Sequence, residues 1–258
     1  KLIGTMSTRP LDCYIEDKKL SLGYVDFLCV HQKYRKKGIA PKVIYSHYVN
    51  SRYKDKNTVF LFKREGAATL IVPLTAYKNY LFDIFYWEKL VKFDQPNIRT
   101  ILINKQNLHY FVYVYERLMK CSTKKFKCVI MPNLNHIELL VKDEQMFISV
   151  TLIDNEPYDM FVFHNTYTSY NGKRGMECIC SFKETDESVF VLGFMCSISL
   201  IYERIKFTRL FIENISNNNI IIKNILKRYQ PVLKTDASYY FYNFGYRPFV
   251  STNVFILN

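Results

Sequence analysis

The sequence predicts an α/β protein of the α+β kind, in which a mixed, twisted sheet is flanked by helices. Strand-like apolar runs and helical patterns alternate along the 258 residues. The clearest unit is residues 24–48, where an apolar strand leads into a basic loop and then into a helix with Pro41 in its first turn. Because 49% of the residues are hydrophobic and only 8 are Gly and 8 Pro, a large core with few flexible linkers is expected.

The first part of the chain predicts a hairpin followed by further strands and a helix. Strands are expected over residues 1–9 and 20–30, with a turn at 17–19, and then over 58–62 and 69–77, separated by a turn at Gly66. A helix is expected over residues 41–53. Residues 83–100 are irregular and contain Pro96, which predicts the joint between two halves.

The second part predicts the same alternation of elements. Helical spacing indicates a helix over residues 106–120, and a solvated basic loop is expected over 122–127. Residues 129–168 predict a helix, a strand, a turn and a strand, the hairpin being 146–152 and 158–164. The remaining predictions are strand-like and then helical structure over 189–204, strands over 209–214, 238–244 and 253–258, and a helix over 219–229.

The basic loop has the properties of a phosphate-binding site. Backbone N–H groups in the first turn of a helix have no partner within the helix, and the helix dipole adds partial positive charge there. Gly38 allows the backbone to approach an anion closely. Full positive charges come from Lys33, Arg35, Lys36 and Lys37.

Charge and cysteine content limit the classes of partner. The formal net charge of +13 suits an anionic partner. The seven cysteines are scattered and include no Cys-x-x-Cys pair, so neither a metal site nor a disulfide framework is expected. Reduced thiols in a cytoplasmic protein are expected instead. No run of apolar residues has transmembrane length. The five histidines show no spacing typical of a triad or a metal site.

The loop also resembles a known acyl-CoA-binding motif. Residues 35–40 (Arg-Lys-Lys-Gly-Ile-Ala) resemble the acyl-CoA loop Arg/Gln-x-x-Gly-x-Gly/Ala of the acetyltransferase (GNAT) superfamily. The longer run 27–41, Phe-Leu-Cys-Val-His-x-Lys-x-Arg-x-Lys-x-x-Ala-Pro, is similar to the signature of the N-myristoyltransferases. Residues 239–244 (Tyr-Tyr-Phe-Tyr-Asn-Phe), followed by a short apolar strand at the end, resemble the C-terminal segment of that family.

This resemblance implies a fold of tandem GNAT-like halves. Residues 1–100 are expected to bind acyl-CoA, and residues 101–258 are expected to bind a peptide and to end in the catalytic C-terminus. Members of the family carry a longer stretch before the first hairpin, so the resemblance implies that the N-terminal part of the first half is missing here.

The resemblance also implies an activity and a set of site residues. The reaction is transfer of a myristoyl group from myristoyl-CoA, the co-substrate, to the N-terminal glycine amine of a protein. The N–H groups of Phe27 and Leu28 are the expected oxyanion hole, and the terminal carboxylate of Asn258 is the expected base. Expected contacts to the co-substrate are Cys29, Val30, Lys33, Arg35, Lys36, Lys37, Gly38, Ile39, Ala40 and Pro41. Expected contacts to the peptide are Thr75, Tyr77, Tyr80, Glu213 and Asn214.

Other functions are also considered. One alternative is another acyl-CoA N-acyltransferase, such as an N-acetyltransferase; another is a non-enzymatic descendant of the fold, for example a viral structural protein. A nucleic-acid-binding module ranks last, because the basic residues gather in one loop and in short turns rather than on a face with interleaved aromatic residues. The expected partners are proteins with an N-terminal glycine, with no specific nucleic acid, and the protein is expected to be a monomer.

Overall fold

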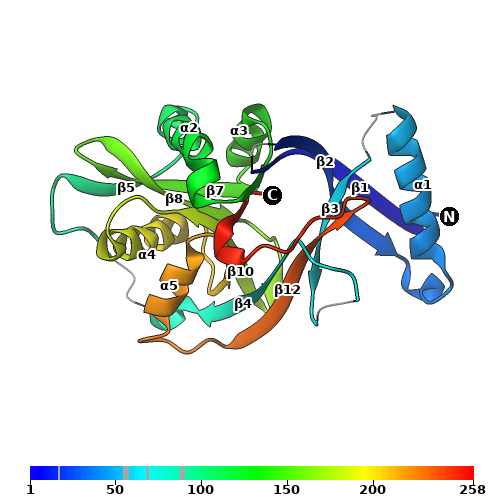
Figure 1. The fold of residues 1–258 in the computed structure, drawn as a ribbon. Helices are drawn as coiled ribbons and strands as arrows, with labels where there is room; N and C mark the ends of the chain where they lie inside the picture. Colours follow the sequence, from blue (N-terminus) through cyan, green and yellow to red (C-terminus); the bar gives the residue numbers. More distant parts are fainter. Residues whose placement is uncertain (17, 55–57, 68–69, 88–90) are drawn as a thin grey trace.

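The computed structural model describes residues 1–16, 18–54, 58–67, 70–87 and 91–258 (Figure 1). Within them, thirteen strands form one mixed sheet and five α-helices pack against it, as the α+β prediction requires. Asp17 of the predicted turn, Thr69 of a predicted strand and residues 88–90 of the predicted joint lie outside the described residues.

The N-terminal part confirms the predicted hairpin and helix. Strands β1 (Gly4–Ile15) and β2 (Lys18–Val30) pair antiparallel, and α1 (Ile39–Lys54) packs against both. Strand β1 continues past Pro10, where the sequence predicted an end at residue 9. Its other neighbour, β6 (Cys128–Met131), pairs only from Asp12 to Ile15, so at Pro10 this side of β1 is an open edge, where proline is tolerated.

The strand predicted over residues 69–77 is wrong in its position. Strand β3 (Phe60–Glu65) is followed by irregular backbone, and β4 runs from Thr75 to Asp83. Leu70, Ile71 and Val72 are exposed, so their apolar character does not come from strand burial. The expected joint holds a short 3-10 helix, Ile84–Tyr86, and β5 (Ile98–Leu102).

The second part confirms most of the predicted elements and differs from the prediction at others. Helix α2 (Leu108–Lys125) includes most of the predicted basic loop, and α4 (Glu187–Arg204) is helical from its start, where a strand was expected. Strand β10 (Lys173–Phe182) and the short β9 (Ser169–Tyr170) were not predicted. The other elements are α3 (Leu134–Lys142), β7 (Met146–Ile153), β8 (Glu156–His164), β11 (Arg209–Glu213), α5 (Asn218–Ile225), β12 (Leu233–Tyr242) and β13 (Val254–Ile256).

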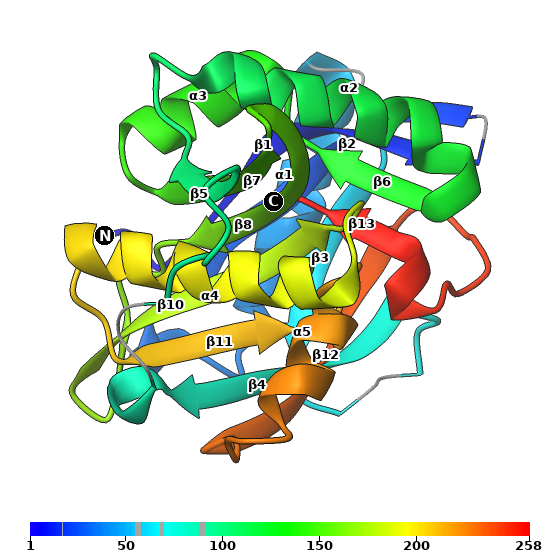
Figure 2. The same cartoon turned by 90° about the vertical axis from the view of Figure 1, so that its left-hand side faces the viewer.

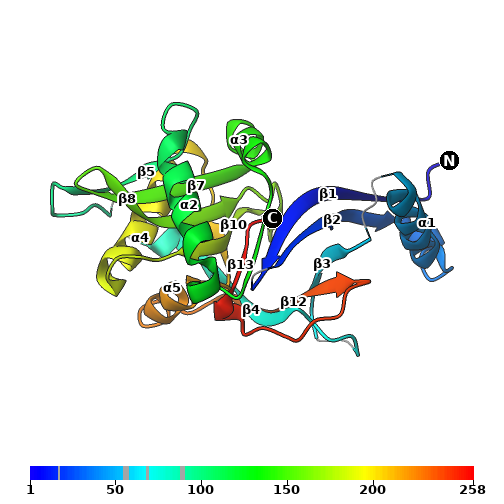
Figure 3. The ribbon, with the colours of Figure 1, turned by 45° about the horizontal axis from the view of Figure 1, so that its top comes forward.

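Strands from early and late parts of the chain alternate in the sheet. Its order is β13-β6-β1-β2-β3-β12-β4-β11-β10-β8-β7-β5, and the short β9 pairs with β10 beside this path. Strand β12 therefore lies between β3 and β4, and the last strand, β13, pairs with β6. The C-terminus lies near the centre of the molecule, between the β1–β2 hairpin and the β7–β10 part of the sheet (Figure 3). The division into halves at residue 100 stays a prediction.

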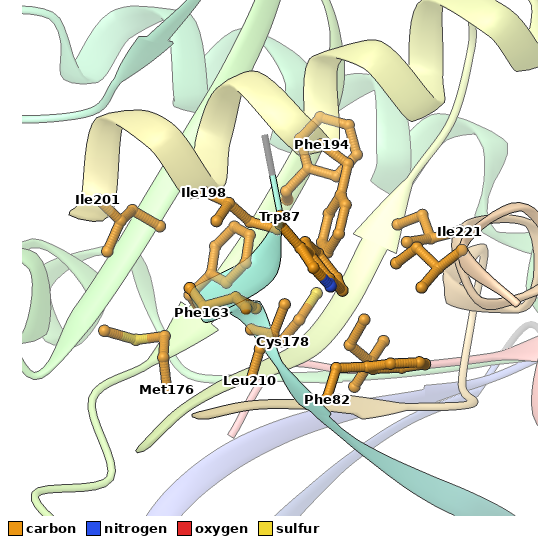
Figure 4. Close-up of a cluster of buried hydrophobic side chains, with 14 of the residues drawn as sticks. Phe82, Trp87, Phe163, Met176, Cys178, Phe194, Ile198, Ile201, Leu210 and Ile221 are labelled. Carbon is orange, nitrogen blue, oxygen red and sulfur yellow. The ribbon is translucent and has the colours of Figure 1, made fainter. Parts of the chain in front are cut away.

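Helices cover both faces of the β7–β8–β10 region (Figure 2). Phe190, Phe194 and Ile201 of α4 pack with buried side chains of β8, β10 and β11 and with Trp87 (Figure 4). On the opposite face, Phe111, Val114 and Leu118 of α2 pack on β7 and β8. These two cores hold the central strands rigidly, which fixes the side chains that β10 and β11 contribute to the site described next.

Candidate active site

The β1–β2 ladder is interrupted at the two predicted oxyanion-hole residues. Thr5 pairs with Cys29 and Ser7 with Asp26, so Met6 alone faces Phe27 and Leu28. This is a β-bulge, which leaves the extra residue out of the regular ladder. Phe27 has a φ of +50°, a left-handed conformation that is unfavourable for a bulky side chain. The bulge reorients the backbone at Phe27 and Leu28.

A cavity lies beside the bulge because β2 and β3 separate. These parallel strands pair only at Gly23–Phe60 and Tyr24–Leu61, and beyond these residues they splay apart. The resulting cavity of about 570 Å³ opens between β1, β2, β3, β12 and α1. Its lining residues are mostly apolar, with Lys63 and His47 among the polar ones: Met6, Val25, Phe27, Leu28, Ile44, His47, Tyr48, Phe60, Phe62, Lys63, Ile71 and Tyr242.

The predicted phosphate loop follows β2 directly. A 3-10 turn, Gln32–Tyr34, leads to Lys36 and Gly38, whose φ values are +60° and +70°, and α1 begins at Ile39. Arg35 Nε donates to the carbonyl of Val30 (3.2 Å), which ties the loop to the end of the strand. The first turn of α1 contains no acidic residue, and Lys33, Arg35, Lys36 and Lys37 are all exposed. The loop thus presents four cations at a helix N-terminus. Cys29, Val30, Ala40 and Pro41 flank it.

Gly38 allows a direct test of the loop. A Cβ at this position would meet nothing within 4 Å, so only the left-handed backbone requires glycine. Gly38→Val should therefore distort the loop and lower the affinity for a CoA thioester about tenfold or more. Gly38→Asn should have a much smaller effect, since Asn tolerates this conformation. Calorimetric titration with acyl-CoA measures both, and equal affinity of the two variants would contradict the role of the loop backbone.

The residues predicted to contact the peptide divide between two faces of the sheet. Thr75, Tyr77 and Glu213 lie on one face, where Asn79 of β4 pairs with Glu213 of β11. Tyr80 points to the other face and stacks on Phe82 in the core under α4. Asn214 follows β11, and its N–H donates to the carbonyl of Lys78.

A buried ionic cluster stands on the same face, and no sequence pattern predicted it. Lys63 Nζ bonds Glu177 Oε1 at 3.0 Å and also contacts Glu213 Oε1. Asn79 Nδ2 donates to Glu177 Oε1 at 3.4 Å. Glu213 is almost completely buried, with 1% of its surface exposed. We call Lys63, Glu177 and Glu213 the Lys–Glu–Glu cluster.

Burial sets the protonation of this cluster. It raises the pKa of Glu213 to about 8; Lys63 opposes this shift, and the neighbouring Glu177 charge reinforces it. For Glu177, burial acts upward, but the charge of Lys63 and its hydrogen bond lower the pKa below the ordinary value. Burial acts to lower the pKa of Lys63, yet the two carboxylates raise it well above its usual range. Lys63 is therefore a cation, and near pH 7 the two carboxyls hold one proton.

The raised pKa of Glu213 predicts how stability depends on pH. Between pH 4.5 and about pH 8 the folded protein keeps a proton that the unfolded chain releases, so the free energy of unfolding should fall as pH rises. Glu213→Gln removes this titration and should flatten the dependence by an amount on the order of a few kcal/mol. Urea denaturation from pH 5 to pH 9 measures it. Parallel curves for the two proteins would show that Glu213 titrates normally.

The chain end lies next to this cluster. The N–H of Leu257 donates to the carbonyl of Ile130 (2.8 Å), which extends the β13–β6 pairing to the last residues. Tyr239 Oη and Asn258 Oδ1 are 3.4 Å apart and hydrogen-bonded, and Tyr239 pairs with Lys63 in the β12–β3 register. Asn258 is therefore held over the sheet face that carries Lys63, Tyr77 and Glu213.

The described residues contain neither a metal-binding cluster nor a membrane-spanning helix. No group of three or more His, Cys, Asp or Glu side chains among them could hold a metal ion. No helix in these parts of the chain is long and apolar enough to cross a membrane.

Comparison with known proteins agrees with this geometry. Residues 1–60 match the family model of the N-terminal domain of myristoyl-CoA:protein N-myristoyltransferase. That segment contains the bulge and the basic loop. Over these residues the chain is similar to the N-myristoyltransferases. No curated protein sequence matches the chain.

Solved structures show the same fold at low sequence identity. Saccharomyces cerevisiae N-myristoyltransferase with bound myristoyl-CoA matches with a TM-score of 0.74 and 13% identity, covering 100% of this chain and 74% of the yeast chain. A second structure of that enzyme with bound myristoyl-CoA gives a TM-score of 0.75 over 100% and 70% of the two chains, again at 13% identity. A GCN5-related N-acetyltransferase from Kribbella flavida matches with a TM-score of 0.57 and 8% identity, covering 93% of this chain and 56% of the other. The fold is thus that of the N-myristoyltransferases and is GNAT-like.

Proposed function

We propose that this chain is an N-acyltransferase that moves a myristoyl group from myristoyl-CoA to the N-terminal glycine amine of a protein. The observation that carries the proposal is the bulge at Phe27 and Leu28, which lies beside a mostly apolar cavity and just before a basic loop. The yeast N-myristoyltransferases that share the fold hold myristoyl-CoA, which supports the same co-substrate here.

The bulge is suited to stabilising the charge that develops during acyl transfer. When the acceptor amine attacks the thioester carbon, negative charge collects on the carbonyl oxygen. Preorganised N–H groups, here those of Phe27 and Leu28, stabilise this charge most where water is excluded. The carbon–sulfur bond then breaks, and the CoA thiolate takes up a proton as the amide forms.

The co-substrate and the acceptor approach from different sides in this proposal. The basic loop and the first turn of α1 hold the CoA phosphates, and the cavity takes the chain beyond the thioester. The acceptor lies on the face that carries Thr75, Tyr77 and Glu213, and the terminal carboxylate of Asn258 takes the proton of the amine. Residues 1–100 then serve mainly acyl-CoA, and residues 101–258 serve mainly the peptide.

The loop charges should determine the affinity for CoA. Replacing Lys33 and Arg35 together by Ala should weaken acyl-CoA binding about tenfold or more, because charge-assisted hydrogen bonds contribute roughly 1.5–3 kcal/mol each. The loss should shrink as salt rises. The matched control is Lys105→Ala with Lys142→Ala, which removes the same charge from exposed positions near α3. Equal affinities for the two double variants would contradict a specific phosphate loop.

Calorimetry with myristoyl-CoA, acetyl-CoA and free CoA tests the function itself. Tight binding of myristoyl-CoA and weak binding of the other two are expected. Preference for acetyl-CoA would instead indicate an N-acetyltransferase. If no thioester binds, the chain is a non-enzymatic descendant of the fold and the proposal is wrong.

A further inference from the structure

Three segments that are far apart in the sequence meet at the end of the sheet where β4 stops and β11 begins (Figure 2). The N–H of Ile84 donates to the carbonyl of Thr208 (3.0 Å), and the N–H of Thr208 donates to the carbonyl of Arg174 (3.2 Å). These bonds join the 3-10 helix Ile84–Tyr86, the loop between α4 and β11, and the start of β10. A groove of about 420 Å³ lies among them, and its lining includes Phe85, Tyr86, Lys173, Arg174 and Lys206.

The groove carries an excess of positive charge. None of the described residues that line it is acidic. Arg174 and Lys206 are exposed, and neither forms an ion pair within the described parts of the chain. Lys173 Nζ (3.0 Å) and Arg209 Nη1 (2.8 Å) share one oxygen, Oδ2 of Asp83. Four cations with one carboxylate leave a net charge of +3 on these groups, so this end of the sheet attracts anions.

Exposed aromatic rings stand among these cations. The exposed fractions of Phe85, Tyr86 and Tyr167 are 52%, 79% and 65%. The guanidinium of Arg174 lies over the ring of Tyr167, at 6.0 Å from its centroid. The sequence carries these residues in separate short turns, and the fold brings them onto one surface. We call this surface the basic–aromatic face and define it by Phe85, Tyr86, Tyr167, Lys173, Arg174 and Lys206.

The surface of an anionic membrane fits both properties of this face. Aromatic rings are favoured at a membrane–water interface, where one end of the side chain is in an apolar layer and the other is wet. Lys and Arg side chains keep their charges at the level of the lipid phosphates while their apolar stems lie deeper. We propose that the basic–aromatic face docks on an anionic membrane surface, with lipid phosphates in the groove and the rings of Phe85 and Tyr86 at headgroup depth.

The arrangement of the rings favours a membrane over a single-stranded nucleic acid. Bases stack on ring faces that a protein presents one after another along a groove. The ring planes of Phe85 and Tyr86 stand at 86° to each other, so these rings do not form such a platform. The neighbouring ring of Tyr202 has Lys206 Nζ over one face, at 4.3 Å from the centroid. Insertion of two perpendicular rings into a headgroup layer requires no parallel ring faces, so lipid is the partner that this face fits.

Docking at this face leaves the proposed acyl-transfer site accessible. The cavity beside the bulge opens between β1, β2, β3, β12 and α1. The basic–aromatic face is formed instead where β4 and α4 end and where β10 and β11 begin. Helices α1 and α4 lie at opposite ends of the molecule (Figure 1). Membrane docking therefore does not depend on acyl transfer, and its test is independent of that activity.

Binding of the full chain to lipid vesicles tests the proposal. The probes are vesicles of phosphatidylcholine alone and vesicles that contain about one third phosphatidylserine. Arg174→Gln with Lys206→Gln should weaken binding to the anionic vesicles about tenfold or more, because each basic residue at the surface adds to the attraction. Lys105→Gln with Lys142→Gln removes the same charge from exposed positions near α3 and is the matched control. This control should bind far more tightly than the first variant.

The aromatic contribution is measured with a second pair of variants. Tyr86→Ser should weaken vesicle binding several-fold at low and at high salt, because insertion of a ring is not screened by ions. Tyr53→Ser is the matched control, since Tyr53 on α1 is 84% exposed and Tyr86 is 79% exposed. Arg174→Lys with Lys206→Arg keeps both charges and should bind as the native chain does. A thermal melt of each variant excludes unfolding.

The single tryptophan of the chain reports the orientation of the bound protein. Trp87 directly follows Tyr86, so energy transfer from Trp87 to dansyl-labelled lipid headgroups should be strong in the docked state. In the comparison protein, Trp87→Phe with Tyr53→Trp, the fluorophore lies on α1 and transfer should be weak.

Three results would overturn the proposal. They are absence of binding to the anionic vesicles, equal losses in the two charge variants, and equal energy transfer from the two tryptophan positions. A single-stranded oligothymidylate provides the competing probe. If it bound the native chain but not Arg174→Gln with Lys206→Gln, and vesicles did not bind, the face would be a nucleic-acid site and the membrane proposal would be wrong.

Discussion

A chain extended by a short tag after Asn258 is expected to transfer acyl groups about 10²–10⁴ times more slowly than a chain that ends at Asn258, the usual contribution of a positioned base. The tag moves the carboxylate away from the face that carries Lys63 and Glu213. Asn258→Ala should stay active, since it keeps the carboxylate and loses only the contact with Tyr239. Single-turnover transfer to a Gly-initiated peptide measures the effect.

Two further variants make this experiment specific. Deletion of Asn258 alone moves the carboxylate back by one residue, roughly 3.3 Å, and leaves the buried Leu257 in place. It should also slow transfer without unfolding the protein. The same tag placed before Lys1 is the matched control. Acyl-CoA affinity should be unchanged in every variant, because the phosphate loop is untouched. Transfer at the native rate by the C-terminally tagged chain would contradict the assignment of the Asn258 carboxylate as the base.

Lys63→Met is expected to destabilise the protein by about 3–5 kcal/mol above pH 8, because it leaves two buried carboxylates without their cation. The loss should be smaller at pH 5, where the carboxyls can take up protons. Adding Glu213→Gln should recover part of the stability, since only one buried carboxylate then remains. Urea denaturation of the single and double variants measures the coupling.

An exposed ion pair provides the control for this prediction. Lys78 Nζ and Asp236 Oδ1 are 2.8 Å apart, with about half of each side chain exposed to solvent. Exposed pairs contribute roughly 0–1 kcal/mol, so Lys78→Met should change stability little. If Lys63→Met were as mild as Lys78→Met at high pH, the Lys–Glu–Glu cluster would not be an ionised, buried unit.

The hairpin, the loop and α1 could be predicted because their signals are local. An apolar run, a basic stretch with Gly38 and a helical pattern with Pro41 follow one another within eighteen residues (24–41), and the structure has them in that order. Helix α4 was harder to recognise. Its buried face includes Phe190, Phe194 and Ile201, and its richness in apolar and aromatic residues hid the helical period at its start.

The strand β4 and the ionic cluster depend on contacts that local patterns do not contain. Leu70 and Ile71 are apolar and yet exposed, so a rule that places apolar residues in strands set the start of β4 too early. Lys63 lies on β3, whereas Glu213 and Glu177 lie on β11 and β10, which β12 and β4 separate from β3 in the sheet. Such pairings come from the order of strands, which single-sequence reasoning did not supply. Tandem halves also stay a prediction.

The central claim is that the bulge, the cavity and the loop form an acyl-transfer site for long-chain thioesters. Single-turnover reaction of the protein with myristoyl-CoA and two peptides that differ only in an N-terminal Gly or an N-acetylated Gly, followed by mass spectrometry, tests it most directly. The account predicts a myristoylated product from the free glycine peptide alone, and none from the blocked peptide. Binding of myristoyl-CoA with no transfer to the free glycine peptide would contradict it.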